Sequence, residues 1–469
     1  MRDPEILPRA LLVSTGAAMA SNRLSHFYDL RGASQTIDTG CSTTLTAFHQ
    51  ACQSIQCEES DMSVISASNV ILNPDNFMVM SSAFLSEAGR SYAFDSRASG
   101  YGRGEGSATV IIKRLDHALR DNDPIRAVVR ATAVNQDGKT ETITTPSQEA
   151  QATLIRDCYR KAGLDPADTT YFEAHGTGTP TGDPIEAGAV ASGFSQGGQR
   201  PTPLKIGSVK TNIGHTETVS GLASIIKVVM ALQNKQIPAN VNFEKPNPAI
   251  PFEAYRLQVS RGMIIVQTSL LMHLQIPTEL ESWKESAGLR RASVNNFGYG
   301  GANAHVILED YASYSSLNET NPLLIKGSQD SIQSPRSRIF TLSAKDEQAA
   351  GRMASDLAEH LKTAAPDSQE LYLDNLAYTL GQRRSKLSWV NAQSATSLPE
   401  LITKLEASQT NPSRTQEKPR VGLVFTGQGA QWWAMGRELI EAYPIFKDTI
   451  VAAGSHLKDL GCTWSVMGM

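Results

Sequence analysis

Short β-branched runs alternate with helix-like stretches between residues 30 and 240 of this chain. Examples of these runs are IRAVVRATAV at 125–134, TTYFEA at 169–174 and LKIGSV at 204–209. Each run is followed by a loop rich in glycine or polar residues. This alternation is typical of an α/β fold built on a buried sheet. In open α/β sheets ligands gather at the carboxyl ends of the strands, so the loops after the strands are the first place to look for a site.

The composition excludes several classes of protein. The 469 residues are 40% hydrophobic, which is enough for a large core and about three units of ~150 residues. A net charge of −4 gives no basic field for nucleic acid, and no run of 18 apolar residues is present to span a membrane. Five cysteines in so long a chain favour free thiols in a reducing compartment, so we expect a cytoplasmic protein.

The composition changes after about residue 310. A stretch rich in Ser, Asn and Pro follows there and has the character of a connector. Residues 346–405 are mixed and partly helical, as in a small linker domain. A new unit is predicted to start at residues 420–440, RVGLVFTGQGAQWWAMGRELI, where an apolar strand is followed by a glycine turn and a helix.

Cys41 lies where the extended run QTID gives way to a helix-like stretch, directly after Gly40. In the first turn of a helix, unpaired N–H groups and the helix dipole lower the pKa of a thiol, which predicts a nucleophilic thiolate. The alternative is an inert cysteine in the core. Cys52 and Cys57 fit that alternative better, because no histidine pair at zinc-binding spacing accompanies them.

His175 and His215 each follow a predicted strand, inside the loops HGTGTPTGDP and KTNIGHTETVSG. These loops and the one after Cys41 could converge on a single crevice. Lys210 and Glu217 flank His215 and could orient it as a charged pair, or they could be an ordinary surface pair. A fourth segment, NNFGYGGANAHVIL at 295–308, provides a glycine-rich turn that would let backbone approach a ligand closely.

Together these segments resemble the β-ketoacyl synthase domain of fungal highly reducing type I polyketide synthases. GYGRGEG at 100–106 and NQDG at 135–138 extend the resemblance, and FTGQGAQ at 425–431 resembles the start of a malonyl-type acyltransferase domain. The resemblance implies a thiolase-like fold of five αβαβα layers, a small α/β linker domain and an acyltransferase fragment. It divides the chain into two ketosynthase halves (1–120, truncated, and 121–310), a linker (311–419) and the acyltransferase start (420–469).

The resemblance also implies a mechanism and a set of site residues. Cys41 would carry the growing acyl chain as a thioester, while His175 and His215 assist decarboxylation of malonyl-carrier protein and stabilise the developing oxyanions. The backbone N–H of Cys41 would complete an oxyanion hole. The implied supporting residues are Lys210, Glu217 and the gating Phe297, the substrate-binding residues are Thr177, Thr179 and Asn303, and the acyltransferase oxyanion-hole candidate is Gln428.

The same resemblance implies which groups and partners the chain uses. Phosphopantetheine would arrive on an acyl carrier protein, with no cofactor bound directly and no metal, and the intact synthase would be a homodimer. A thiolase is less consistent with the sequence, since it would place a second cysteine in the last glycine-rich loop, where this chain has His305. The two histidines favour a decarboxylating synthase.

Three departures from the family pattern raise an alternative. Only 40 residues precede Cys41, so the chain would begin mid-domain and be prone to aggregate. Residues 259–273 form an apolar insertion, either a retained intron or a surface loop. The chain also stops before any acyltransferase nucleophile. The alternative hypothesis is therefore a catalytically inactive fragment of such a synthase.

Overall fold

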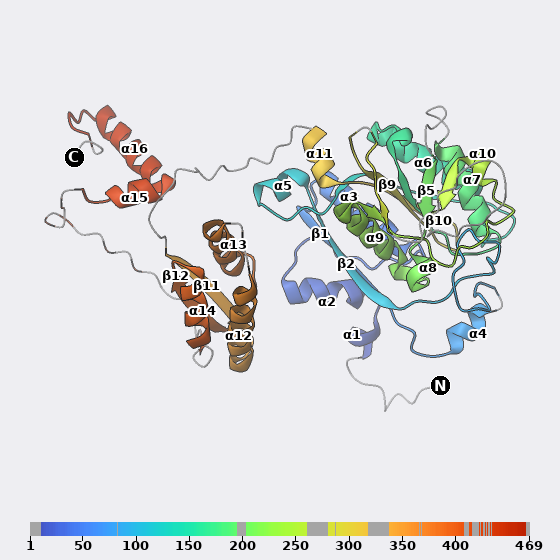
Figure 1. Cartoon of the computed structure of the whole chain (residues 1–469), viewed down its shortest axis with the longest axis horizontal. Coiled ribbons are helices and arrows are strands. Elements are labelled where there is room, and N and C mark those ends of the chain that lie inside the picture. Colours follow the sequence, from blue (N-terminus) through green and yellow to red (C-terminus); the bar gives the residue numbers. More distant parts are fainter. Residues whose placement is uncertain are drawn as a thin grey trace. The chain divides into compact units, whose positions relative to one another are not determined.

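The computed structural model describes residues 11–81, 83–194, 203–259, 280–286, 288–317, 337–364, 366, 368–407, 412–414, 422, 424, 427, 429, 432 and 434–465. The chain divides into two units, Met1–Leu324 and Ile325–Met469, and each is described by itself (Figure 1). Residues 260–273, which make up nearly all of the predicted insertion, lie outside the described residues, as does Gln428.

A six-stranded mixed sheet forms the centre of the first unit. The strand order is β3 (Val128–Gln136), β10 (Ala302–Glu309), β9 (Arg291–Phe297), β4 (Tyr171–Glu173), β5 (Leu204–Gly207) and β7 (Leu257–Val259). The first three strands pair antiparallel, whereas β9, β4, β5 and β7 run parallel. Because β4 and β5 are parallel neighbours, the loops that follow them leave the sheet at the same edge.

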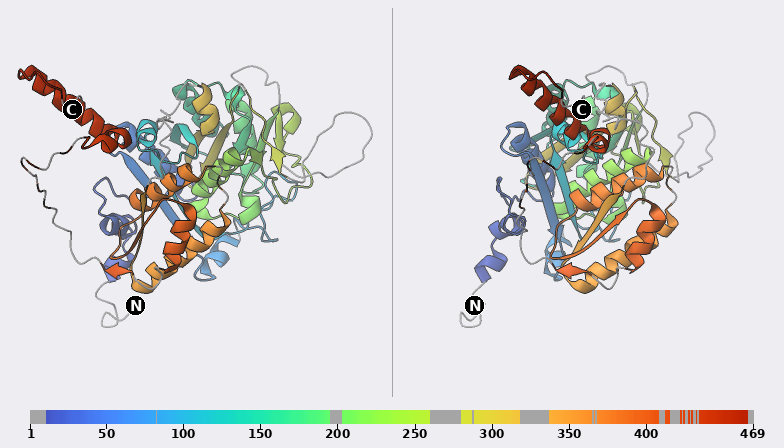
Figure 2. Two further views of the ribbon diagram at one scale, coloured as in Figure 1. Left: turned by 60° about the vertical axis from the view of Figure 1, so that its left-hand side comes forward. Right: turned by 90° about the vertical axis from the view of Figure 1, so that its left-hand side faces the viewer.

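Helices cover both faces of this sheet (Figure 2). On one face, α3 (Thr43–Gln56) and α9 (Ser220–Asn234) pack between the sheet and the antiparallel pair β1 (Met62–Asn69) and β2 (Gly106–Lys113). On the other face lie α6 (Gln148–Ala162) and α7 (Gly182–Phe194). The described residues thus form four consecutive layers, β–α–β–α.

The sequence explains why α3 and α6, one helix from each face of the sheet, form where they do. Helix α3 buries Leu45, Phe48, Cys52 and Ile55, the apolar residues whose spacing of three and four predicts a helix with one inward face. Helix α6 begins after Ser147, whose hydroxyl accepts the N–H of Ala150, and ends at Gly163 in the left-handed conformation.

Shorter elements complete the first unit. They are the helices α1 (Leu11–Thr15), α2 (Ala18–Tyr28), α4 (Asp75–Ser81), α5 (Leu115–Arg120), α8 (Lys210–Ile213), α10 (Phe252–Tyr255) and α11 (Tyr311–Leu317), the 3₁₀ turns η2 (Pro166–Asp168) and η4 (Glu217–Val219), and the strand pair β6 (Gln236–Ile237) and β8 (Glu281–Ser282).

The second unit contains a small α/β domain. Strands β11 (Arg338–Ala344), β12 (Trp389–Ala395) and β13 (Ser413–Arg414) form its sheet, and the helices are α12 (Glu347–Thr363), α13 (Gln369–Gln382) and α14 (Leu398–Ala407). Its core is built around Phe340, Leu361 and Leu401. Two further helices follow, α15 (Arg437–Ala442) and α16 (Pro444–Asp459).

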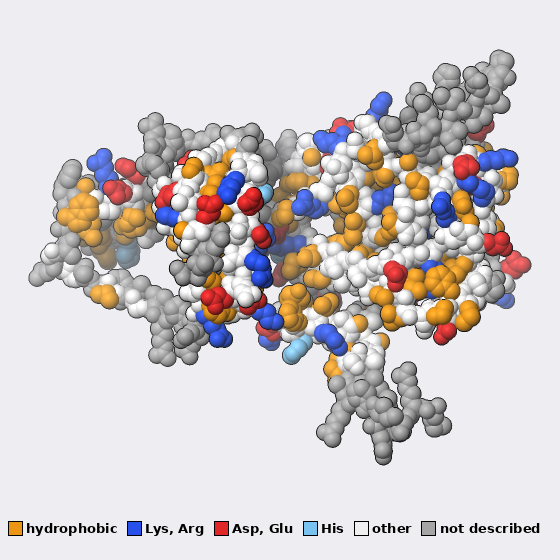
Figure 3. Space-filling view, turned by 60° about the horizontal axis from the view of Figure 1, so that its bottom comes forward, with side chains coloured by type: hydrophobic (Ala, Val, Ile, Leu, Met, Phe, Trp, Pro, Cys, Tyr) orange, Lys and Arg blue, Asp and Glu red, His pale blue; other side chains and the backbone are white. Residues whose placement is uncertain are grey.

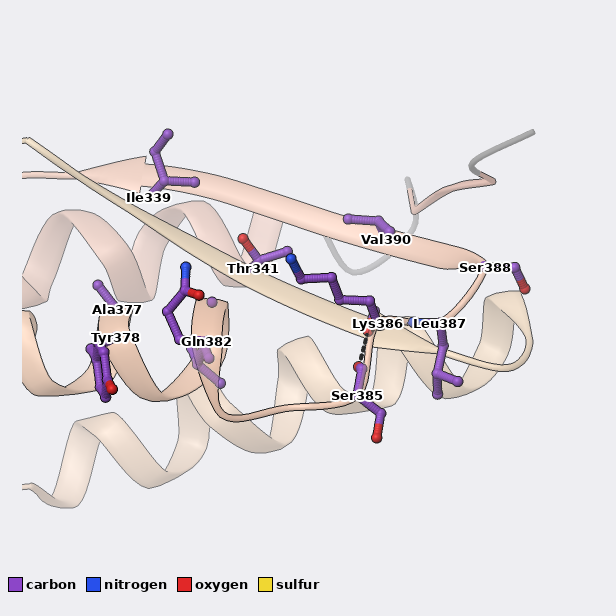
Figure 4. Close-up of a pocket in the computed structure, with 13 residues that line it drawn as sticks. Ile339, Thr341, Ala377, Tyr378, Gln382, Ser385, Lys386, Leu387, Ser388 and Val390 are labelled. Atoms are coloured by element: carbon purple, nitrogen blue, oxygen red, sulfur yellow. Dashed lines mark hydrogen bonds between the residues drawn. The ribbon is translucent and has the colours of Figure 1, made fainter. Parts of the chain in front are cut away.

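A cavity of about 800 Å³ lies beside the C-terminal end of α13. Figure 4 shows Ala377, Tyr378 and Gln382 on its helix side and Ile339 and Val390 on its strand side. Its lining mixes apolar and polar side chains.

The surface carries both signs of charge. On the face shown in Figure 3, Lys and Arg side chains are interspersed with Asp and Glu, in keeping with the formal net charge of −4. Among the described helices, none combines the length and the apolar character that a membrane crossing requires.

Candidate active site

Cys41 lies on a tight turn between the extended segment before it and helix α3. Gly40 has φ +66°, and a Cβ there would come within 3.0 Å of the Tyr299 ring, so only glycine fits this turn without strain. Helix α3 begins at Thr43, with Ser42 as its N-cap. The prediction that Cys41 lies in the first helical turn is therefore wrong by two residues, although the strand-to-helix turn itself is present.

The predicted thiolate is also contradicted. Burial of the thiol raises the pKa of Cys41 to about 11, which outweighs the lowering by the Lys210 ammonium and by the backbone N–H groups of Cys41 and Tyr299 that face the sulfur. The resting nucleophile is accordingly a thiol. Because both N–H groups face the sulfur, they are the candidate donors of an oxyanion hole. Tyr299 was not among the predicted site residues.

This shift predicts how Cys41 reacts with an alkylating reagent. Since only the thiolate reacts, the alkylation rate should rise about tenfold per pH unit from pH 7 to 9 without reaching a plateau. The measurement is the rate of iodoacetamide labelling at Cys41, followed by peptide mass spectrometry. A plateau below pH 8 would show instead that a helix-type lowering of the pKa dominates.

The two predicted histidines lie side by side. The rings of His175 and His215 have centroids 5.5 Å apart and are nearly perpendicular. His175 follows β4 directly and His215 follows β5 through the short helix α8, so the parallel pairing of these strands brings the two loops together. Burial, chiefly, and the nearby Lys210 ammonium lower the pKa of both imidazoles well below 6.5, so both rings are neutral.

The tautomer of His215 follows from a hydrogen bond to its ring. The backbone N–H of Glu217 donates to Nδ1 of His215 at 3.3 Å, so the proton of the neutral ring is on Nε2. The ring is fully buried and packs edge-on against Tyr101, with centroids 4.7 Å apart. Nε2 has no hydrogen-bond partner among the described residues. It is therefore a donor available to a ligand.

Two further unpartnered atoms accompany this one. Nδ1 of His175 and Nζ of Lys210 are buried and have no hydrogen-bond partner within the described part of the chain. Lys210 is 1% exposed, and burial lowers the pKa of its ammonium, while the nearby Glu173, Glu186 and Cys41 act in the opposite direction. A buried polar atom left unpartnered costs about 1–3 kcal/mol. Three in one place indicate a site prepared for a polar ligand.

Two buried carboxylates at the start of α7 hold the loop that carries His175. The carboxylate of Glu186 accepts the N–H groups of His175 and Gly176, both at 2.8 Å. Asp183 accepts the N–H groups of Gly178 at 3.0 Å and Phe94 at 2.7 Å. The sequence motif GDPIEAG contains both carboxylates, but their roles are only apparent once the loop is seen folded over them.

The structure brings some of the remaining predicted residues to the histidines. The ring of Phe297 is buried with its centroid 5.6 Å from that of His175. Thr177 and Thr179 lie on the His175 loop with their hydroxyl oxygens 3.2 Å apart. Glu217 lies next to His215, but its carboxylate pairs with Arg103 at 2.7 Å. No ion pair between Glu217 and Lys210 is present in the described structure.

Asn303 lies opposite Phe297 in the pairing of β10 with β9. Its side-chain amide donates to Asn135 Oδ1 at 3.1 Å and to Asp137 Oδ1 at 2.8 Å, which ties strand β10 to the NQDG loop. Cys52 is buried in α3 and Cys57 is exposed. Among the described residues, no three His, Cys, Asp or Glu side chains cluster as metal ligands would.

A cysteine on a turn before a helix, two neutral imidazoles and a buried lysine together define a condensing-enzyme type of site. Three models of protein families match the chain: "Beta-ketoacyl synthase, N-terminal domain" at residues 4–118, "Beta-ketoacyl synthase, C-terminal domain" at 126–244 and "Ketoacyl-synthetase C-terminal extension" at 265–389. The chain therefore belongs to the β-ketoacyl synthase family, with the ketosynthase halves and extension of a polyketide synthase.

Curated relatives agree with this assignment. The chain is 52% identical over 473 residues to the highly reducing polyketide synthase sor1 of Hypocrea jecorina and 50% identical over 468 residues to the lovastatin diketide synthase mokB of Monascus pilosus. These matches cover 100% and 99% of this chain but 17% and 18% of the relatives. The chain thus corresponds to less than a fifth of the length of these synthases.

Solved structures confirm the thiolase-like α/β fold. The ketosynthase from module 6 of the bacillaene synthase of Bacillus subtilis is 33% identical, with a TM-score of 0.70 over 87% of this chain and 65% of that one. The oxazolomycin ketosynthase domain from Streptomyces albus gives 30% identity and a TM-score of 0.69 over 85% of this chain and 63% of that one.

Proposed function

We propose that this chain elongates a polyketide by decarboxylative Claisen condensation, using Cys41, His175 and His215. The observation that carries the proposal is the group of unpartnered buried atoms on His175, Lys210 and His215. Their charges and rings interact with one another, and Lys210 interacts with the Cys41 sulfur. The arrangement suits a negatively charged oxygen that forms during a reaction and is absent from the resting protein.

The first step is transfer of an acyl group to Cys41. The Cys41 sulfur attacks the thioester carbonyl of an acyl-carrier protein, the carbon–sulfur bond to the carrier breaks, and the Cys41 proton goes to the departing carrier thiol. The N–H groups of Cys41 and Tyr299 support the proposal, because both face the sulfur and could stabilise the tetrahedral oxyanion. A soft thiol suits this step, since it is both a good nucleophile and a good leaving group.

The second step forms the carbon–carbon bond. A malonyl thioester loses its terminal carboxylate as carbon dioxide, and the electron pair of the broken bond becomes the enolate, whose oxygen His175 and His215 stabilise. The enolate carbon attacks the Cys41 thioester, and the Cys41–acyl bond breaks to return the sulfur, which takes up a proton. The product is a β-ketoacyl thioester on the carrier. Neutral imidazole N–H groups supply these hydrogen bonds without a metal.

The surrounding assignments are part of the same proposal. Thr177 and Thr179 would contact the phosphopantetheine arm of an acyl carrier protein, which delivers the substrates, and the intact synthase would be a cytoplasmic homodimer. The chain would contain two ketosynthase halves at 1–120 and 121–310, a linker at 311–419 and the start of an acyltransferase domain at 420–469. The family models that match residues 4–118 and 126–244 support the boundary near residue 120.

The proposal is tested by intact-mass spectrometry after incubation with an acyl-pantetheine thioester. We expect the protein to gain one acyl group, Cys41→Ala to gain none, and Cys57→Ala, which replaces an exposed cysteine, to behave like the wild type. No adduct on wild-type protein that is folded by circular dichroism, or an adduct that survives Cys41→Ala, would reject the proposal and favour the inactive fragment.

A further inference from the structure

We propose that Arg103 is a positioning residue for His215 and acts through Glu217. This inference rests on the proposed function, because it assigns a role within the same site. Arg103 belongs to the motif GYGRGEG, whose arginine has no role in the mechanism above.

Arg103 and His215 are joined through the backbone. The N–H of His215 donates to the carbonyl of Gly102 at 2.7 Å, and the N–H of Gly104 donates to the carbonyl of His215 at 2.9 Å. The two residues thereby form a short parallel bridge. The position of the His215 backbone is consequently fixed against the segment that carries Arg103.

The side chain of Arg103 also contacts the segment that carries His215. Its Nε donates to Oε1 of Glu217 at 2.7 Å, and the two side chains are 3% and 20% exposed. The guanidinium carbon also lies 4.7 Å from the centre of the Phe77 ring, a cation–π contact that helps to orient the side chain. Such a buried, oriented pair constrains Glu217 far more than an exposed ion pair would.

Glu217 needs this constraint because of its backbone. Its φ is +51°, a conformation that residues other than glycine rarely adopt. In this conformation its N–H points at Nδ1 of His215. If the Arg103 contact is lost, Glu217 can relax, the N–H turns away from Nδ1, and the proton of His215 is no longer kept on Nε2.

The charge of Arg103, like its contact with Glu217, favours the neutral form of His215. His215 is surrounded by the cations Lys210 and Arg103, the carboxylate of Glu217, the phenol of Tyr101 and the ring of His175. After burial, Lys210 and Arg103 are the causes that lower the pKa of His215. Removing the Arg103 charge, and leaving the Glu217 carboxylate unpaired, raises the pKa of His215. As the pH falls, the ring of the variant is therefore protonated at a higher pH than that of the wild type.

The experiment measures single-turnover condensation across a range of pH, using the natural full-length polypeptide after acylation. It compares four proteins, the wild type and three variants. Arg103→Leu should slow condensation about tenfold, as removal of an outer hydrogen-bonding partner does, and move the acid limb of the profile to higher pH. Arg103→Leu combined with Glu217→Gly should recover most of the rate, because glycine adopts a positive φ freely and leaves no unpaired carboxylate. Arg114→Leu, which removes an arginine from a partly exposed pair with Asp116, is the control.

Acylation of Cys41 should change less than twofold in every variant, which shows that each is folded. The inference is overturned if Arg103→Leu condenses at the rate of the control with an unchanged pH profile, or if adding Glu217→Gly deepens the defect. In either case, condensation by the wild-type protein would still support the proposed function. A wild type that is acylated but does not condense overturns the proposed function, and this inference with it.

Discussion

His215→Ala is expected to slow condensation by about 10²–10³-fold, the effect of removing one oxyanion donor from a preorganised site. Nε2 of His215 is a buried donor with no partner in the described structure, so its hydrogen bond forms only when the reaction produces a negative oxygen. The measurement is the rate of β-ketoacyl product formation from pre-acylated protein and a malonyl thioester, in single-turnover mode.

The control separates this effect from a general loss of structure. Acylation of Cys41 uses the N–H groups of Cys41 and Tyr299, so it should remain within about threefold of wild type in His215→Ala. His117→Ala replaces a histidine on helix α5 that lies beside Asp61 and has no part in the proposed mechanism, so it should leave both steps unchanged. Equal losses in acylation and condensation would contradict the role given to His215.

Glu173→Ala is expected to lower the free energy of unfolding by about 3–5 kcal/mol, the cost of removing one partner from a buried ion pair. Glu173 is fully buried at the end of β4. Its carboxylate accepts from Lys227 Nζ at 2.7 Å, from the Tyr171 hydroxyl at 2.7 Å and from the N–H of Val209 at 2.6 Å. The Tyr171 hydroxyl and the Val209 N–H would lose this acceptor, and Lys227 would keep only its hydrogen bond to the Tyr171 hydroxyl, at 2.9 Å.

Urea unfolding of the first unit, followed by circular dichroism, checks this value. Glu149→Ala removes a carboxylate that is 77% exposed beside Arg156 and should cost less than about 1 kcal/mol. Because Val209 immediately precedes Lys210, Glu173→Ala should also slow condensation in whatever protein remains folded. A loss in stability no larger than that of Glu149→Ala would show that Glu173 does not hold the β4 and β5 loops together.

The sequence was sufficient to predict the α/β class and the meeting of the two histidines. Strands that alternate with helices along the chain tend to pair in parallel within a sheet, and the loops after parallel neighbours leave the sheet at one edge. His175 after β4 and His215 after β5 follow that rule. The buried face of α3 is likewise a local property, since the spacing of Leu45, Phe48 and Ile55 determines it.

Properties that depend on distant contacts could not be predicted in the same way. A helix start lowers the pKa of a thiol, but burial by residues far along the chain raises that of Cys41 to about 11. The proximity of Lys210 and Glu217 in sequence suggested a pair, whereas the folded partner of Glu217 is Arg103, 114 residues away. Tyr299 contributes a backbone N–H, which any residue type could supply, so no side-chain pattern reveals it.

A crystal structure of the protein acylated at Cys41 tests the central claim most directly. We predict that the thioester carbonyl accepts the N–H groups of Cys41 and Tyr299, and that Nε2 of His215 and the ring of His175 both face the space beside the acyl carbon, within reach of one enolate oxygen. An acyl group seated with either imidazole turned away, or held on a residue other than Cys41, would contradict the account.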